Sequence, residues 1–184
     1  MRPHTKYSSG FTLLEIMVVI CIMAIMTTLI LPYLGSFGQA TLRSQARRLA
    51  GRVNFLFNEA QGNKLVLRLT LDIDKQGYAV SKLDPYAISL DPKTGEPIFS
   101  PETSSAGRPV ALPDGVTFRD ITVEGVGTVN RGQVSVQFYP QGYVDPTVIH
   151  LQDDRHHVLT LAFNPLIGTV SILDGNVMPP GLFQ

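Results

Sequence analysis

The sequence predicts an α+β protein in which one long N-terminal helix packs against an antiparallel β-sheet domain. Three observations lead to this fold class. Residues 11–34 form an apolar run, residues 42–60 repeat apolar positions with the period of a helix, and from residue 64 the apolar positions alternate. The 184 residues are enough for one domain with an appendage.

The apolar run over residues 11–34 is expected to be a transmembrane helix. No charged residue stands between Glu15 and Arg43, and about 20 apolar residues cross a bilayer as a helix. Basic side chains precede the run, and the positive-inside rule therefore predicts a cytoplasmic N-terminus. These side chains are Arg2, His4 and Lys6.

A cleaved secretory signal is the alternative for this segment, because it has the same order of basic, apolar and small residues. Residues 38–40, Gly-Gln-Ala, match its small-residue cleavage site poorly. They also fall in a stretch that itself predicts helix. We therefore expect the run to be retained.

Residues 35–62 are predicted to continue the helix as an amphipathic segment, with one helix running from Phe11 to Gln61 and bent at Pro32. Gly62 is the expected C-terminal stop. The arginines fall largely opposite the apolar stripe, where we expect a solvated face or contact with lipid headgroups rather than a specific partner site. The stripe comprises Leu42, Ala46, Leu49, Ala50, Val53, Leu56, Phe57 and Ala60, and the arginines are Arg43, Arg47, Arg48 and Arg52.

The remainder, residues 63–184, is predicted to be a β-rich domain. Alternating apolar residues and turn signals indicate short antiparallel strands joined by tight turns. Residues 84–114 are rich in proline and have a weak strand pattern, so we interpret them as a long loop or irregular insertion. The expected strands are KLVLRLTLD, YAVSK, GVTFRDITV, QVSVQFY, TVIHLQD, HVLTLAF and TVSIL.

Glu15 is the unusual residue of the apolar run. A carboxylate in hydrocarbon costs a few kcal/mol even near a helix end, and a plain membrane anchor has no use for one.

The stretch GFTLLEIMVVICIMAIM, residues 10–26, resembles the prepilin signature of type IV pilins and type II secretion pseudopilins. The matching features are Gly10, aromatic Phe11, Glu15 and the apolar run, after a short basic leader over residues 1–10. Pro32 also falls where many pilins have a helix-bending proline. The resemblance implies a type IV pilin-like fold.

The same resemblance implies roles for these residues. A prepilin peptidase would cut between Gly10 and Phe11 on the cytoplasmic side and N-methylate Phe11. Glu15 would pair with the N-terminal ammonium of a neighbouring subunit during assembly, which compensates the buried carboxylate. The alternative is that Glu15 extends to the cytoplasmic headgroups.

A second resemblance, to the C-terminal part of H-type (GspH/FimT-like) minor pseudopilins, covers QFYPQGYVD to TVSIL. It rests on an aromatic-x-Pro-x-Gly turn and a late glycine before a final β-run. The matching residues are Phe138, Pro140, Gly142 and Gly168.

Other patterns indicate turns or surface rather than chemistry. Asp72, Asp74 and Gly77 begin like a calcium loop but lack its later acidic ligand, so a strand end and tight turn are expected. The three histidines of the β-rich domain are expected at the surface or in turns, without a metal. They are His150, His156 and His157. We find no catalytic constellation and expect no cofactor.

Charge content argues against nucleic-acid binding, and the cysteine count rules out an internal disulfide. The formal net charge is zero, and residues 131–184 hold two arginines, four aspartates and no lysine. Some FimT-like minor pilins bind DNA, but that would call for a basic C-terminal patch, which is missing here. Cys21 is the single cysteine, so no intramolecular disulfide forms.

The sequence therefore predicts a non-enzymatic minor pseudopilin of a type II secretion system, which primes or caps the periplasmic pseudopilus. It would be a single-pass protein of the bacterial inner membrane with a periplasmic C-terminal domain. Its partners would be other pseudopilins, the prepilin peptidase and the inner-membrane assembly platform. A minor type IV pilin for pilus initiation, adhesion, motility or DNA uptake is the first alternative. An envelope enzyme with an uncut membrane tether is the second.

Overall fold

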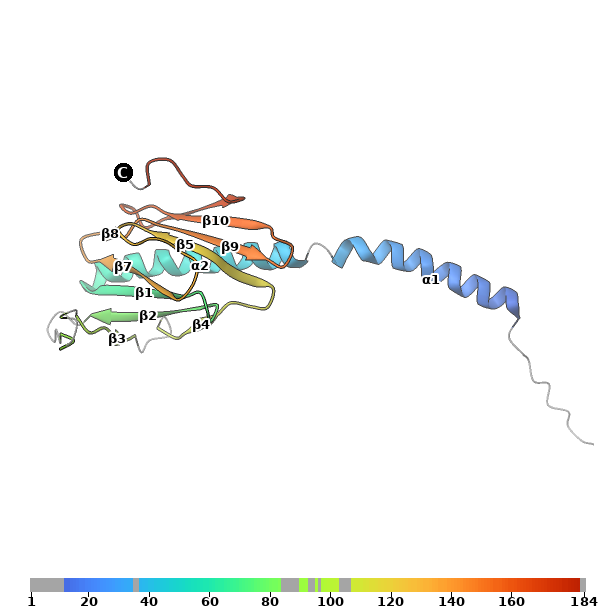
Figure 1. The fold of residues 1–184 in the computed structure, drawn as a ribbon, viewed down its shortest axis with the longest axis horizontal. Coiled ribbons are helices and arrows are strands. Elements are labelled where there is room, and N and C mark those ends of the chain that lie inside the picture. Colours follow the sequence, from blue (N-terminus) through green and yellow to red (C-terminus); the bar gives the residue numbers. More distant parts are fainter. Residues whose placement is uncertain are drawn as a thin grey trace, which may run out of the picture. The chain divides into compact units, whose positions relative to one another are not determined.

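The computed structural model describes residues 12–34, 37–83, 90–92, 95, 97–102 and 107–182 (Figure 1); for residues 29–34 and 37 it describes the backbone alone. The chain divides into two compact units, Met1–Phe37 and Gly38–Gln184. Within its described residues the first unit is helical, and the second combines a helix with two β-sheets.

The region predicted as one helix contains two, α1 (Leu13–Leu34) and α2 (Phe37–Asn63). Gly35 and Ser36 between the two helices lie outside the described residues, so the prediction of one continuous helix stays a prediction. Near the junction of α1 and α2, Pro32, Gly35 and Gly38 have low helix propensity. Pro32 falls in the last turn of α1, and the bend expected there stays a prediction.

The C-terminus of α2 is capped by a residue that the sequence did not indicate. Lys64 adopts a left-handed conformation with φ of 56°, and the amide of Leu65 donates to the carbonyl of Ala60 at 3.1 Å. This 6→1 hydrogen bond, which runs from an amide to the carbonyl five residues earlier, is the signature of a Schellman cap. The helix therefore ends at Asn63, with Lys64 rather than a glycine in the left-handed position.

Two antiparallel sheets take the place of the single sheet that was predicted. The first has the order β3-β2-β1-β7-β8, with β4 also paired to β2, and the second has the order β11-β10-β9-β5-β6. The first sheet comprises β1 (Val66–Asp72), β2 (Gly77–Leu83), β3 (Ser100–Pro101), β4 (Val110–Ala111), β7 (Gln133–Tyr139) and β8 (Tyr143–Val144). The second comprises β5 (Val116–Val123), β6 (Gly127–Val129), β9 (Thr147–Asp153), β10 (Val158–Phe163) and β11 (Val170–Asp174).

The described parts of residues 84–114 are more ordered than the predicted loop. They contribute β3 and β4 to the edge of the first sheet. Lys82 pairs with Glu102 at 3.2 Å, and the guanidinium of Arg68 lies 3.6 Å from the centre of the Phe99 ring. An ion pair and a cation–π contact thus hold this segment against the sheet.

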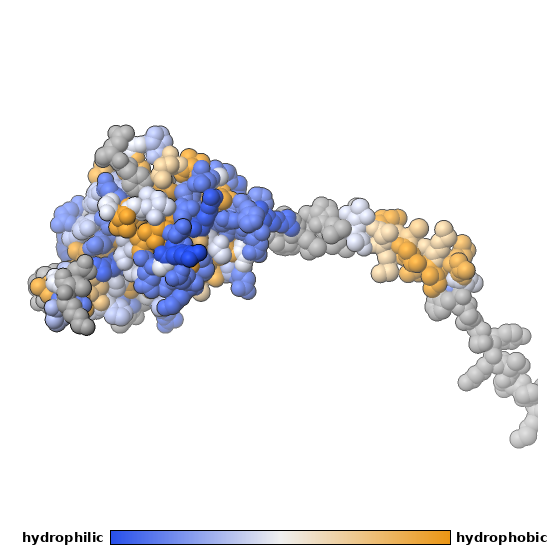
Figure 2. All heavy atoms as spheres, in the orientation of Figure 1, coloured by the Kyte–Doolittle hydropathy of each residue, from blue (hydrophilic) through white to orange (hydrophobic). Residues whose placement is uncertain are grey.

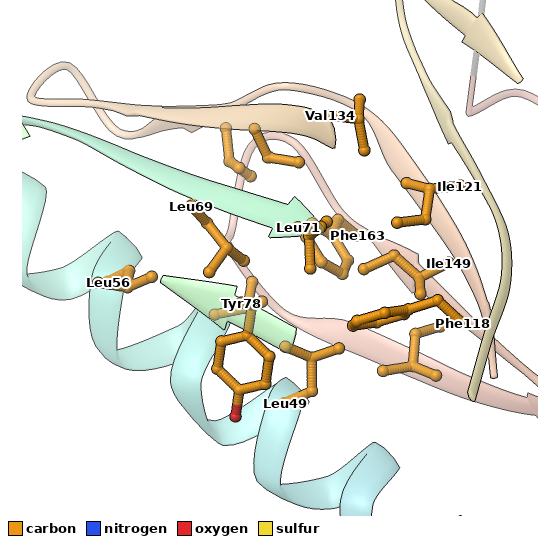
Figure 3. Packing of buried hydrophobic residues seen from close by; sticks show 14 of the residues in the cluster. Leu49, Leu56, Leu69, Leu71, Tyr78, Phe118, Ile121, Val134, Ile149 and Phe163 are labelled. Atoms are coloured by element: carbon orange, nitrogen blue, oxygen red, sulfur yellow. The ribbon is translucent and has the colours of Figure 1, made fainter. Parts of the chain in front are cut away.

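The core lies between α2 and the two sheets, and it confirms the apolar stripe predicted for the helix. All eight predicted stripe residues are buried, from Leu42 to Ala60. Alternate residues of β1 meet them, because successive side chains of a strand point to opposite faces. Figure 3 shows Leu49 and Leu56 of α2 beside Leu69, Leu71, Tyr78, Phe118, Ile121, Val134, Ile149 and Phe163 of the strands.

The turn between β10 and β11 is fixed against α2 by a glycine. Gly168 has φ of +64°, and a Cβ placed on it would lie 2.1 Å from the ring of Phe57. Its amide donates to the carbonyl of Asn164 at 3.0 Å. Glycine is required here for two reasons, the left-handed backbone and the close approach of the aromatic ring.

We predict that Gly168→Ala destabilises the second unit by about 2–4 kcal/mol, because left-handed strain adds to overpacking against Phe57. Urea unfolding of the detergent-solubilised chain, followed by circular dichroism, measures the change. Gly175→Ala is the matched control, since Gly175 has φ of +88° but open space around it. It should cost only about 1 kcal/mol; equal losses for the two variants would refute the contact with Phe57.

Candidate functional site

The first turn of α1 places Glu15 in a defined cap. The hydroxyl Oγ1 of Thr12 accepts a hydrogen bond from the amide of Glu15 at 3.3 Å. The carbonyl of Thr12 accepts from the amides of Glu15 and Ile16 at 3.1 and 3.3 Å. Thr12 is therefore the N-cap, and Thr12-Leu-Leu-Glu15 has the sequence of a capping box. Thr12 was not among the predicted site residues, although the Thr-x-x-Glu spacing is visible in the sequence.

The described side chains of α1 after Glu15, residues 16–28, are all exposed, and all but Thr27 and Thr28 are apolar. Figure 2 shows the described part of the helix in the colours of hydrophobic residues. The hydroxyls of Thr27 and Thr28 donate to the carbonyls of Met23 and Ala24, both at 2.8 Å, so neither hydroxyl needs water. The exposed apolar side chains are Leu13, Leu14, Ile16, Met17, Val18, Val19, Ile20, Ile22, Met23, Ile25 and Met26.

Among the described residues, no helix combines the length and the hydropathy of a membrane span.

Glu15 is the one acidic or basic residue in α1, and it is exposed in the isolated chain. Two interactions can stabilise its carboxylate. One is the positive end of its own helix, since the amides of the first turn favour a negative charge there. The other is a cation from outside the helix. Gly10 and Phe11, the residues predicted for cleavage and methylation, lie outside the described residues, so the pairing of Glu15 stays a prediction.

The exposed face of α2 carries the arginines, as the sequence indicated. Arg43, Arg47 and Arg48 are exposed, and Arg52 is partly buried. The guanidinium of Arg43 contacts Asp174 at 2.9 Å, and both side chains are more than half exposed. Such an exposed pair contributes little to stability.

One of the three histidines contradicts the expectation of a surface or turn position. His150 is 3% exposed in β9, and its Nδ1 lies 2.5 Å from Oδ1 of Asp120 in β5. Its Nε2 is buried and has no hydrogen-bond partner in the described structure. Asp120 was missed because it is 30 residues away in the sequence and meets His150 only through strand pairing.

The other two histidines lie in the turn between β9 and β10, as expected. His156 is exposed, with a left-handed φ of 63°. His157 is 46% exposed and contacts Asp153 at 2.9 Å through its Nδ1. No three His, Cys, Asp or Glu side chains of the described segments come together as a metal site.

Asp153 organises this turn from a buried position. Its carboxylate accepts hydrogen bonds from the amides of Arg155 and His157, both at 2.9 Å, and contacts the ring of His157. Burial by itself would raise the pKa of Asp153, but these hydrogen bonds, above all those from His157, outweigh it and hold the pKa below its usual value. Asp153 is thus ionised and structural, not a free acid.

Asp72 has a similar role at the turn between β1 and β2. Its carboxylate accepts from the amide of Lys75 at 2.9 Å and from the side chain of Gln133 at 2.7 Å. These hydrogen bonds lower its pKa. Asp72 therefore forms the strand end and tight turn that the sequence indicated.

Comparisons with known proteins match both parts of the chain. Residues 5–31 match the model of the prokaryotic N-terminal methylation motif. One structure of the minor pseudopilin EpsH from the type II secretion system of Vibrio cholerae has a TM-score of 0.50 at 13% identity, covering 72% of this chain and 95% of that one. A crystal structure of EpsH gives 0.51 at 15% identity, covering 76% and 98%. No curated protein matches the sequence.

These findings confirm the prepilin-type N-terminal motif and the pilin-like α+β fold that the sequence predicted. The likeness extends over nearly the whole of both solved EpsH chains. At this level of identity it establishes the fold.

We predict that Glu15→Gln and Glu15→Ala both abolish assembly, because each removes the charge that would pair with a neighbour's N-terminal ammonium. Glutamine retains the capping box, so the two variants separate the two roles of Glu15. Cross-linking of the chain to its assembly partners in native membranes measures the effect, after leader removal has been verified for each variant. If Glu15→Gln cross-links like the unchanged protein, the charge pair is refuted and the cap suffices.

We predict that Asp153 contributes stability that disappears in acid. Its pKa is lower in the folded chain than the unfolded value of about 3.9, so the contribution is present above that pH and is lost as pH falls through the folded pKa. Asp153→Asn should cost about 2 kcal/mol at neutral pH and flatten the acid limb of stability against pH, measured by urea unfolding. Exposed Asp154→Asn is the control; the same loss in Asp154→Asn would contradict this account.

Proposed function

We propose that this chain is a minor pseudopilin, a structural subunit of the periplasmic fibre that drives protein export in a type II secretion system. The proposal rests on two features that occur together in this chain. A prokaryotic N-terminal methylation motif over residues 5–31 precedes a domain with the fold of a minor pseudopilin. Either feature alone would leave the function open.

The N-terminus is proposed to be processed before assembly. A prepilin peptidase removes residues 1–10 by cutting the Gly10–Phe11 bond and then methylates the new amino group of Phe11. Cleavage creates a cation four residues before Glu15 in every subunit. Each Glu15 can then pair with the ammonium of a neighbouring chain.

This pairing would set the register of the helices in the fibre. A carboxylate and an ammonium in an apolar environment compensate one another only when they are side by side, and an unpaired buried charge is costly. A helix displaced by one turn would separate the two groups by about 5.4 Å. The aligned register is therefore favoured over its neighbours.

We place α1 in the inner membrane, with the N-terminus in the cytoplasm and the domain in the periplasm. The run without charged residues from Ile16 to Leu42 supports this, as do the internally bonded threonine hydroxyls. The four arginines of α2 outnumber the basic residues of the leader, so a simple positive-inside count would predict the opposite orientation. Large domains cross largely regardless of their charge, however, and these arginines belong to one.

The role proposed for the folded unit is interaction rather than catalysis. Its buried helix stripe ties α2 rigidly to both sheets, so a displacement of α2 would move the whole unit. That coupling suits a subunit that primes or caps a fibre and transmits movement to cargo. Other pseudopilins and the inner-membrane assembly platform would be its partners.

A minor type IV pilin that initiates a surface pilus is the second candidate, since the methylation motif serves both kinds of fibre. Deleting the gene in its native host separates them. A pseudopilin is expected to be needed for the appearance of secreted proteins in the medium, with surface pili unchanged. Loss of pili, twitching or DNA uptake with normal secretion would support the pilin instead. Complementation by the unchanged gene is the control.

A further inference from the structure

The exposed face of α2 forms a basic surface near the start of the helix. Arg43, Ser44, Arg47 and Arg48, with Ala40, line an open hollow of about 460 Å³. Figure 2 shows hydrophilic side chains over the beginning of α2. The helix as a whole contains four arginines but only one acidic residue, Glu59. We call the four polar lining residues, Arg43, Ser44, Arg47 and Arg48, the basic face.

Most of the positive charge on this face is not neutralised within the described structure. Arg43 pairs with Asp174 at 2.9 Å, whereas Arg47 and Arg48 are exposed and form no ion pair with any described residue. Glu59 cannot form an ion pair with them, because it lies more than two turns further along the helix. Its carboxylate accepts a hydrogen bond from the side chain of Asn63 at 2.6 Å. The two guanidinium groups are therefore available to an external anion.

An aromatic side chain extends the basic face in the direction of the helix axis. Phe55 follows Arg48 by seven residues, so the two lie on the same side of α2. Phe55 is 47% exposed, and it is the one large exposed apolar side chain among the described side chains of α2. Arginines beside a bulky apolar residue, on a helix whose opposite side is covered, are typical of helices that lie in a membrane interface.

The position of the basic face in the chain indicates which anion it meets. Only Gly35 and Ser36 separate α2 from α1, and Arg43 lies about 9 Å of helix beyond Phe37. If α1 spans the bilayer, as proposed above, the basic face is tethered within reach of the headgroups before any partner subunit arrives. Guanidinium groups bind phosphate with paired hydrogen bonds.

We propose that the basic face of α2, with Phe55 beside it, docks on the anionic phospholipid headgroups of the outer leaflet while the subunit waits in the membrane. This inference rests on the proposed insertion of α1. Docking would hold the folded unit down on the membrane surface. Assembly into a fibre then requires its release, so anionic lipid competes with extraction of the subunit.

The test uses the full chain in vesicles of phosphatidylcholine alone or mixed with phosphatidylglycerol. A fluorescent label on Ser44→Cys, in a Cys21→Ser background, reports docking through quenching by headgroup spin-labelled lipid. We expect quenching in the anionic vesicles that is weak in phosphatidylcholine and is reversed by salt. Arg47→Gln with Arg48→Gln should reduce the docking equilibrium roughly fivefold for each arginine removed.

A matched control removes the same charge elsewhere. Arg108→Gln with Arg131→Gln changes two exposed arginines outside α2 and should leave quenching unchanged. Equal quenching in the two kinds of vesicle, or equal effects of the two double variants, would overturn the docking. A third result would also overturn it: the label at position 44 becomes buried only when partner subunits are added, whatever the lipid charge. The basic face would then be a protein contact.

The native Cys21 keeps this test separate from that of the proposed function. It is an exposed residue of α1, so a label on it reports insertion through quenching by acyl-chain spin-labelled lipid. Quenching at Cys21 without lipid-dependent quenching at position 44 would refute the docking and leave insertion intact. Absence of acyl-chain quenching at Cys21 would refute the proposed membrane-inserted subunit itself.

Discussion

Glu15 introduces one carboxylate at the start of a helix that is otherwise apolar, and the proposed biology depends on how that charge is compensated. In water the group is compatible with the first turn, where Thr12 caps the helix and the amide dipoles favour a negative charge. In an apolar environment the same group requires a cation, because the cost of an unpaired charge is a few kcal/mol. Leader removal would create such a cation on each neighbouring chain. One residue would then link processing, membrane residence and fibre register.

The helix α2 has two faces that differ in burial and charge. One face is buried against both sheets, and its packing is tight enough that a glycine is needed where Gly168 meets Phe57. The opposite face is basic and carries the exposed Phe55. A helix with a covered apolar side and a charged outer side can fix the domain while it presents charge to a membrane surface. The same helix would later have to leave that surface as the fibre forms.

Strong periodic signals in the sequence predicted most of the fold. The strands β7 and β9 coincide with the predicted QVSVQFY and TVIHLQD segments, and the helix stripe is buried throughout. The division into two sheets was not predictable from alternation, since alternation does not show which strands pair. The strands β3, β4, β6 and β8 have two or three residues each, too few to show a period.

The unforeseen contacts are those between residues distant in sequence. His150 was expected at the surface or in a turn, because no acidic or cysteine partner stands at a metal-binding spacing from it in the sequence. The outer side of its sheet is covered, however: Thr160, which pairs with His150 in register, bonds to Gly175 and Val177 beyond β11. Asp120 and the Arg43–Asp174 pair likewise depend on the tertiary fold. In the candidate site, Glu15 was recognised because it is a charged residue in an apolar run. The cap formed by Thr12 was not predicted.

The most direct test of the central claim is the N-terminal peptide of the protein extracted from its native membrane, identified by mass spectrometry. The account predicts a peptide that begins with N-methylated Phe11, since only this cleavage creates the ammonium that Glu15 would pair with. An intact terminus at Met1 would mean a static anchor. A terminus near Ala40 would mean a secreted soluble domain, and either result would contradict the assembly role.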